Sequence, residues 1–268
     1  MFNTLKMDLR RLFKSRSFYT ILGVTAGLLI LVTVMAYAIS DPNTMDAMEA
    51  RGAEVNESDR VMSEYIRSMP QLEMTHETLG SGFLLVMIGI GMTLFVNSDF
   101  SSGFVKNICS ANPRRRDYVL SKASLAGVYS GIMVLLSVAL MAAVPVLIRM
   151  YPAPAPFPQI LRYALWMWPP HWAFALMVLS LVLLTRSSTL GIILSLVVGS
   201  GLTAVMVGTL GRLLGWPPLE KVFLAAVVKG VYVPQSGIAP FGFVLACAAG
   251  WAAVYGIGSL FFMEKRDV

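Results

Sequence analysis

Six long apolar runs constrain the fold of this chain more than any other feature of its sequence. Each is close to the ~20 residues that a helix needs to cross the hydrocarbon core of a bilayer. They occupy about 18–39, 80–97, 119–148, 163–185, 189–210 and 240–263. Hydrophobic residues make up 56% of the chain and charged residues only 13%, whereas roughly 25% of a soluble domain is charged. We therefore predict an all-α membrane protein with six transmembrane helices in a single domain, residues 1–268.

The distribution of lysine and arginine predicts the orientation of these spans. With both termini on the cytoplasmic side, 13 of the 21 lysines and arginines are cytoplasmic, as the positive-inside rule requires. Five of them lie in the N-terminal segment: Lys6, Arg10, Arg11, Lys14 and Arg16. A seventh apolar run, 222–233, has only ~12 residues and is too short to span. We interpret 217–233 as a short outer helix, re-entrant or interfacial, before the last span.

Two further segments are predicted to lie at the membrane surface. Residues 1–16 combine an apolar stripe with several cations, which is typical of an amphipathic helix on an anionic leaflet or of a topology signal. The outer loop, 40–79, has a net charge of −6 from nine acidic and three basic residues. Within it, apolar residues at helical spacing predict a helix over about 58–69 that rests against the membrane or a partner.

Small and aromatic residues predict where helices meet and where the bilayer ends. Two glycine pairs have the G-x-x-x-G spacing that permits close helix approach: Gly23 with Gly27, and Gly127 with Gly131. Three tryptophans near the predicted outer end of the fourth span are typical of an interfacial aromatic belt: Trp166, Trp168 and Trp172.

The sequence offers little chemistry of its own. It contains no G-x-x-x-x-G-K-[ST] phosphate loop and no clustered set of residues for hydrolysis, so we expect neither an enzyme nor a bound cofactor. Charged residues are nearly absent inside the spans, where an ion-coupled carrier usually has them. His171 is the one candidate for a transport pathway; alternatively, it caps a carbonyl freed by the neighbouring prolines.

The methionines of the outer loop allow a soft-metal interpretation, because thioethers bind such ions. Those methionines, with one histidine, are Met45, Met48, Met62, Met69, Met74 and His76. Met62 and Met69 fit the apolar stripe of the predicted helix better than a metal site. We predict no metal site, and nothing in the sequence indicates nucleic-acid binding.

The stretch DFSSGFVKNICSANPRRRDYVLSK, residues 99–122, separates the second and third spans. It is polar and cationic, with Gly103, Pro113 and three consecutive arginines. A basic segment held at the cytoplasmic surface between two spans, about 98–118, is suited to docking a cytosolic partner. If the protein moves a substrate uphill, the energy must arrive through such a contact.

This stretch resembles the loop between the second and third spans of ATP-binding-cassette (ABC) exporter permeases of the second structural type. In that family an acidic residue ends the second span, a glycine follows four positions later, and a basic residue comes shortly after the glycine. An arginine then precedes a serine-lysine pair that starts the third span. Here these features fall on Asp99, Gly103, Lys106, Arg114, Ser121 and Lys122. The family usually has glutamate at the position of Asp99. Aspartate keeps the charge but is one methylene shorter than glutamate.

The resemblance implies that residues 100–112 form a coupling helix seated on a cytosolic ABC ATPase, with a second minor contact near Thr185–Ser188. Asp99, Gly103, Lys106, Arg114 and Lys122 would serve this coupling, and ATP-Mg would bind in the partner. The chain would be half of an exporter, paired with a second copy or a paralogue. It would lie in the cytoplasmic (inner) membrane of a bacterial cell, and its cargo would be a peptide antibiotic, a drug or another amphipathic compound.

Two other classes of function stay open at this stage. The first is a self-powered secondary carrier, which the near absence of charges and repeats in the spans argues against. The second is a membrane scaffold or sensor whose basic loop recruits a partner that is not an ATPase, or is held by anionic lipid.

Overall fold

The computed structural model describes residues 2–105, 115–150, 154–216, 219–233 and 237–265. These residues form an almost entirely helical protein with one two-residue hairpin, β1 (Tyr232–Val233) paired with β2 (Gly237–Ile238). Five helices are long and apolar enough to cross a membrane: α2 (Arg16–Ser40), α6 (Phe83–Ser101), α8 (Arg115–Leu147), α9 (Phe157–Thr185) and α14 (Phe241–Lys265). The prediction of an all-α, multi-pass membrane protein is confirmed at this level.

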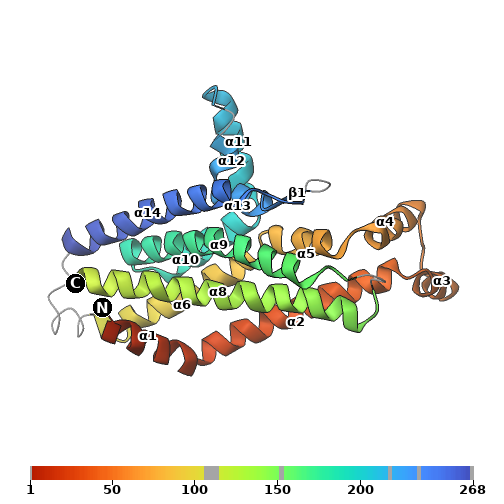
Figure 1. Cartoon of the computed structure of the whole chain (residues 1–268). Helices are drawn as coiled ribbons and strands as arrows, with labels where there is room; N and C mark the ends of the chain where they lie inside the picture. Colours follow the sequence, from red (N-terminus) through yellow and green to blue (C-terminus); the bar gives the residue numbers. More distant parts are fainter. Residues whose placement is uncertain (1, 106–114, 151–153, 217–218, 234–236, 266–268) are drawn as a thin grey trace.

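The predicted span over 189–210 is not one straight helix. It consists of α10 (Ser188–Gly199) and α11 (Leu202–Leu213), which meet at an angle of 68°. Gly201 has a φ of +78°, in the left-handed region that favours glycine, so the helix ends there and restarts in a new direction. This pair is either a broken sixth span or a re-entrant element, and α11 leads away from the bundle (Figure 1).

The prediction of a single outer helix over 217–233 is also wrong. The described part contains two short helices, α12 (Leu219–Val222) and α13 (Leu224–Lys229). Phe223 between them is extended, with φ −69° and ψ 140°. Its ring meets that of Trp251 in α14 edge-on, with the ring centroids 6.2 Å apart. Docking of Phe223 on α14 therefore accompanies the break, and Tyr232–Val233 belong to the hairpin.

The helices run alongside one another, so the bundle has two ends (Figure 1). α1 (Phe2–Lys14) and the last turns of α14 lie at one end, which we call the α1 end. The opposite end carries α3 (Pro42–Ala50) and α4 (Glu57–Ser68), with α5 (Gln71–Gly80) leading back into the bundle. α4 matches the helix predicted over 58–69, and its apolar residues Val61, Met62 and Tyr65 are exposed.

α9 lies at the centre of the bundle and packs against α14, α8 and α6. Its indoles fix it in place: Trp168 Nε1 and Trp172 Nε1 donate to the α8 carbonyls of Gly127 and Ala123 at 2.9 and 3.0 Å. Trp166 Nε1 donates to the carbonyl of Ala239 at 3.0 Å. These three indoles therefore also hold α9 against its neighbours, and their place in an interfacial belt stays a prediction.

Glycines allow α6 and α10 to approach closely. A Cβ added to Gly89 would lie 2.0 Å from Ser195 Oγ, and one added to Gly191 would lie 2.5 Å from Thr93 Oγ1. Gly127 of the predicted pairs is also tight, with Trp172 2.9 Å from an added Cβ. By contrast, an added Cβ at Gly23 or Gly27 of α2 would meet nothing within 4 Å in the described structure.

These distances predict opposite effects of two glycine-to-alanine changes. Gly89→Ala forces α6 and α10 apart and should destabilise the protein by about 1–3 kcal/mol, the usual effect of overpacking. Gly27→Ala meets open space and should be neutral or slightly stabilising, because alanine is the better helix former. Thermal unfolding of both purified variants in one detergent checks this; equal melting temperatures would contradict the close approach.

Candidate functional site

Four charged side chains from three helices meet at the α1 end of the bundle. Lys122 Nζ of α8 lies 2.6 Å from Asp99 Oδ2 of α6 and 2.7 Å from Asp8 Oδ1 of α1. Arg11 Nη1 of α1 lies 2.8 Å from Asp99 Oδ1 and 3.9 Å from Asp8 Oδ1. We call Asp8, Arg11, Asp99 and Lys122 the ion cluster. Its two cations and two anions balance, as buried charges must.

The ion cluster is mostly shielded from solvent, and both of its carboxylates accept hydrogen bonds from neighbouring side chains. The side chains of Asp8, Asp99 and Lys122 are 0% exposed, and that of Arg11 is 30% exposed. Ser121 Oγ donates to Asp8 Oδ2 at 2.8 Å, and the Tyr118 hydroxyl donates to Asp99 Oδ2 at 3.0 Å. The cations also lie near aromatic rings: Arg11 Cζ is 4.0 Å from the Phe104 centroid and Lys122 Nζ 4.7 Å from that of Phe95.

The sequence places Asp8 in the cluster through the helical period of α1. Leu5, Asp8 and Leu12 recur at intervals of three and four residues, so they share one face of the helix. Leu12 is buried in the core, with Leu5 packed against it, and α1 packs on α8. The amphipathic helix predicted over 1–16 thus turns one part of its apolar stripe toward the bundle, while Phe13 stays exposed.

Two of the predicted coupling residues belong to the ion cluster, and a third adjoins it. Asp99 and Lys122 contact each other directly, and Ser121 binds Asp8. Gly103 follows the end of α6 with a φ of +69°, and its N–H donates to the Phe100 carbonyl at 3.2 Å. Phe104, next in sequence, lies over Arg11. Lys106 and Arg114 lie outside the described residues, as does most of the predicted coupling helix.

Sequence reasoning missed Asp8, and one signal could have identified it. Asp8 is the single acidic residue among the cations of α1, and it stands on the apolar stripe. An isolated charge on an otherwise apolar face is expensive to bury unless an opposite charge faces it. The pairing partners, Asp99 and Lys122, become apparent only when α6 and α8 are placed side by side.

The geometry of the ion cluster suits a mechanical role. Asp99 and Lys122 stand at the two ends of the segment predicted to be cytoplasmic, and their ion pair joins those ends. Through Asp8 and Arg11, the same pair holds α1. Contacts of 2.6 to 2.8 Å therefore join α1, α6 and α8 at this end of the bundle.

The second predicted contact lies close to the first. Arg186, in the turn between α9 and α10, has a φ of +54°. Its guanidinium carbon is 5.9 Å from the centroid of the Phe100 ring near the end of α6. The turn at Thr185–Ser188 and the start of the segment 100–112 are therefore neighbours at the same end of the bundle.

His171 is buried in the middle of α9 and binds its own helix. Its Nδ1 lies 2.6 Å from the Met167 carbonyl, to which it donates, while Nε2 has no hydrogen-bond partner in the described part of the chain. Pro169 and Pro170 free the carbonyls four residues before them, those of Leu165 and Trp166. The predicted capping of a proline-freed carbonyl is therefore wrong, since the acceptor is Met167.

At the opposite end of the bundle, both ring nitrogens of His76 make hydrogen bonds to other segments. Its Nε2 lies 2.9 Å from the Lys229 carbonyl and its Nδ1 3.1 Å from the Tyr163 hydroxyl. Because a carbonyl only accepts, Nε2 carries the hydrogen and Nδ1 is left to accept from Tyr163. Met45, Met69 and Met74 are buried, and no group of three histidine, cysteine, aspartate or glutamate side chains suited to a metal occurs among the described residues.

The setting of His76 predicts a pH dependence of stability. Burial lowers the pKa of His76 from its ordinary 6.5, against the raising effects of the Lys229 carbonyl and Glu77. The unfolded chain then binds the proton more readily, so stability is complete above pH 6.5 and falls as the pH drops below it. The melting temperature should decrease as the pH is lowered from about 7.5 to 5.5. His76→Gln should remove most of this dependence of the melting temperature on pH. An unchanged slope in His76→Gln would contradict the assignment.

Comparison with known proteins adds no family assignment: no family model matches the chain, and no curated protein shows significant sequence similarity to it.

Proposed function

We propose that this protein is the membrane-spanning subunit of an ABC exporter, driven by a separate cytosolic ATPase. The observation that carries the proposal is the Asp99–Lys122 contact at 2.6 Å, which joins the ends of the loop resembling the coupling segment of that family. Five long apolar helices and one bent helix pair are consistent with a six-span half-transporter.

The ion cluster supplies a physical route for coupling. Closure of two nucleotide-binding subunits would push on residues 100–112, and the push would reach α1, α6 and α8 together through Asp8, Arg11, Asp99 and Lys122. α9 would follow α8, because two tryptophans of α9 donate to α8 carbonyls. Such rigid-body movement of packed helices is a common way to shift a protein between two conformations.

A second copy or a paralogue would complete the exporter. α2 and α14 bury only 17% of their most apolar windows within one chain, so most of their apolar surface is available to another subunit or to lipid. The cargo proposed is an amphipathic compound such as a peptide antibiotic or a drug. A pathway between two largely uncharged bundles suits such a molecule better than a small ion.

The test is purification of the tagged, full-length protein from detergent-solubilised host membranes, with ATPase activity measured on the eluate. We expect a protein with a phosphate loop to co-purify and to hydrolyse ATP. An eluate without an ATPase would reject the exporter and favour a secondary carrier or a scaffold. Those two are separated by transport driven by an ion gradient in vesicles, which only the carrier would show.

A further inference from the structure

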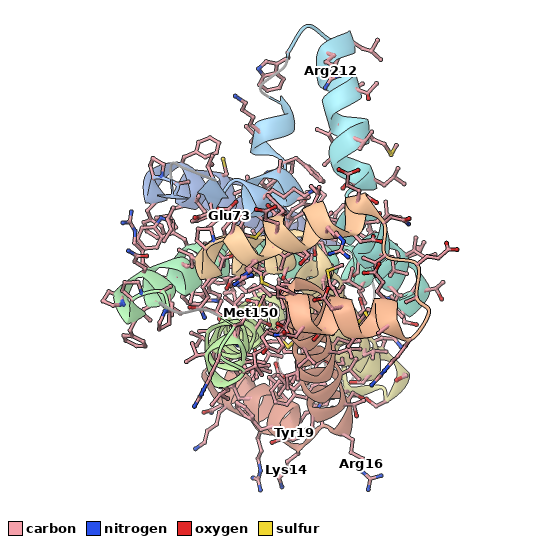
Figure 2. The ribbon with its side chains drawn as sticks, turned by 90° about the vertical axis from the view of Figure 1, so that its right-hand side faces the viewer. Lys14, Arg16, Tyr19, Glu73, Met150 and Arg212 are labelled. Carbon is pink, nitrogen blue, oxygen red and sulfur yellow. The ribbon has the colours of Figure 1, made fainter. Side chains whose placement is uncertain are left out.

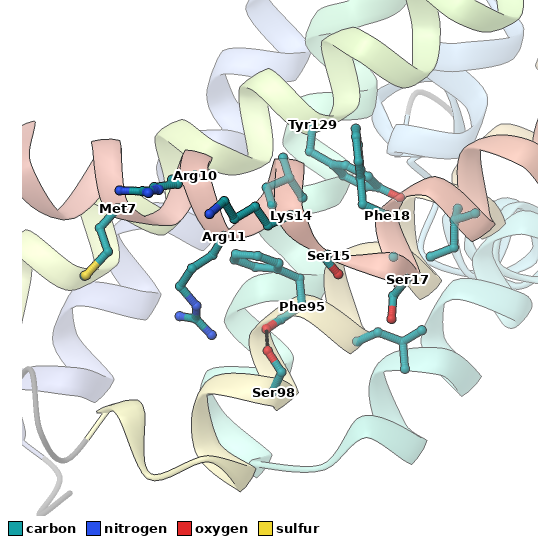
Figure 3. A pocket seen from close by; sticks show the side chains of 14 residues that line it. Met7, Arg10, Arg11, Lys14, Ser15, Ser17, Phe18, Phe95, Ser98 and Tyr129 are labelled. Atoms are coloured by element: carbon teal, nitrogen blue, oxygen red, sulfur yellow. Dashed lines mark hydrogen bonds between the residues drawn. The ribbon is translucent and has the colours of Figure 1, made fainter.

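A cavity of about 430 Å³ opens at the α1 end, in the elbow between α1 and α2. The first turns of α2 form one wall, and Gly91, Leu94 and Phe95 of α6 form another. Figure 3 shows Arg11 and Lys14 of α1 on the side of the cavity where Phe95 and Ser98 lie. The cavity is distinct from the ion cluster, although Arg11 borders both.

One part of this cavity is cationic and lacks countercharge. Arg10 and Lys14 line it and are exposed, and no salt bridge joins either of them to an acid within the described residues. No acidic residue is among the lining side chains that the structure describes. The positive charge of Arg10 and Lys14 is therefore available to an external anion.

Hydrogen-bond donors lie beside these cations. Ser15 precedes α2 but makes no side-chain hydrogen bond to its first turn, and Ser15 and Ser17 both line the cavity. The first N–H groups of a helix have no partner within it and favour a negative charge. Together with the guanidinium of Arg10 and the ammonium of Lys14, they form a set of donors suited to phosphate oxygens.

The remaining part of the cavity is apolar and faces the spans. Ile21 of α2 and Leu94 of α6 line it, and Leu94 is itself exposed on the outside of the bundle. A ligand that fills the cavity thus meets cations at one end and hydrocarbon at the other. Its position between an amphipathic helix and a membrane span corresponds to the depth of lipid head groups. Figure 2 shows Lys14 and Arg16 pointing away from the bundle at this edge.

We propose that this cavity binds one anionic phospholipid, with its phosphate between Arg10 and Lys14 and the start of an acyl chain along Ile21 and Leu94. The proposal needs only that the protein lies in a membrane and does not depend on the ATPase partner. Basic pockets between membrane helices are suited to anionic head groups, and this one adjoins Arg11 of the ion cluster.

The experiment measures lipid binding to the purified full-length protein in detergent by native mass spectrometry. Phosphatidylglycerol and phosphatidylcholine with the same acyl chains are compared. The site variant is Arg10→Gln with Lys14→Gln, and the matched control is Lys6→Gln with Arg16→Gln. The control removes two exposed cations from the same region that do not line the cavity, so both variants lose the same charge.

We expect phosphatidylglycerol to bind more tightly than phosphatidylcholine, and the site variant to weaken this binding about 10- to 30-fold, since each cation near a membrane surface is worth roughly a factor of five. The control should change it by less than about threefold. Equal losses in the two variants would overturn the proposal, because attraction would then be diffuse. Competition by glycerol phosphate at the concentrations where the lipid binds would also overturn it, in favour of a free-phosphate site.

Discussion

Lys122→Met is expected to destabilise the protein by about 3–5 kcal/mol, the usual loss when one member of a buried ion pair is removed. The ammonium of Lys122 contacts both Asp8 and Asp99, and all three side chains are 0% exposed. Without it, two buried carboxylates face each other with only the partly exposed Arg11 as counterion. The measurement is the loss of folded protein on heating in detergent.

The chain offers a matched control for this change. Arg60 Nη2 contacts Glu49 Oε2 at 2.7 Å, as short as the Lys122–Asp8 contact, but these side chains are 53% and 54% exposed. Arg60→Met should therefore change the stability by less than about 1 kcal/mol, as is usual for surface ion pairs. A loss in Arg60→Met as large as that in Lys122→Met would show that burial of the ion cluster does not determine the effect.

A compensated variant separates unpaired charge from lost packing. Asp8→Asn and Asp99→Asn combined with Lys122→Met remove the three buried charges together. The asparagines can still accept from Ser121 and Tyr118. Only Arg11 of the cluster keeps its charge, and it is 30% exposed and so can be solvated. We expect this triple variant to be more stable than Lys122→Met alone, since joint removal of the fully buried charges is tolerated better than removal of one partner. A triple variant less stable than the single one would contradict an electrostatic origin.

The sequence predicted the elements that depend on local composition. Apolar length was enough to place α2, α6, α8, α9 and α14, because a bilayer demands about 20 apolar residues in one helix. The spacing of Val61, Met62 and Tyr65 was enough to predict α4. Asp99 and Lys122 were chosen as site residues from a resemblance, and the structure brings them into contact.

The features that depend on tertiary packing were not predictable in this way. The bend at Gly201 and the break at Phe223 depend on how α11 and α14 are placed, and apolar composition looks the same on both sides of each break. A tryptophan-rich segment near the end of a span is typical of an interfacial belt. It does not indicate that the indoles of Trp166, Trp168 and Trp172 donate to backbone carbonyls of neighbouring segments. Asp8 needed knowledge that α1 folds back onto α8, which helical periodicity alone does not supply.

Gly103→Pro is expected to lower the ATPase activity of the assembled exporter by about tenfold or more, on the proposed function. Gly103 has a φ of +69°, whereas proline holds φ near −65°, so the turn after α6 must be rebuilt. Proline also removes the N–H that donates to the Phe100 carbonyl. Every charge of the ion cluster is retained, so Asp99 and Lys122 stay paired while the segment between them changes direction.

Gly52→Pro is a control with the same local chemistry at the opposite end of the molecule. Gly52 has a φ of +89°, its N–H donates to the Glu49 carbonyl at 2.9 Å, and an added Cβ would meet nothing within 4 Å, as at Gly103. Both variants therefore lose one turn hydrogen bond and strain one glycine. Only Gly103→Pro should uncouple ATP hydrolysis while the permease still reaches the membrane. Full activity in Gly103→Pro, or an equal loss of activity in Gly52→Pro, would show that the turn after α6 has no specific role in coupling. The ion cluster would then only stabilise the fold.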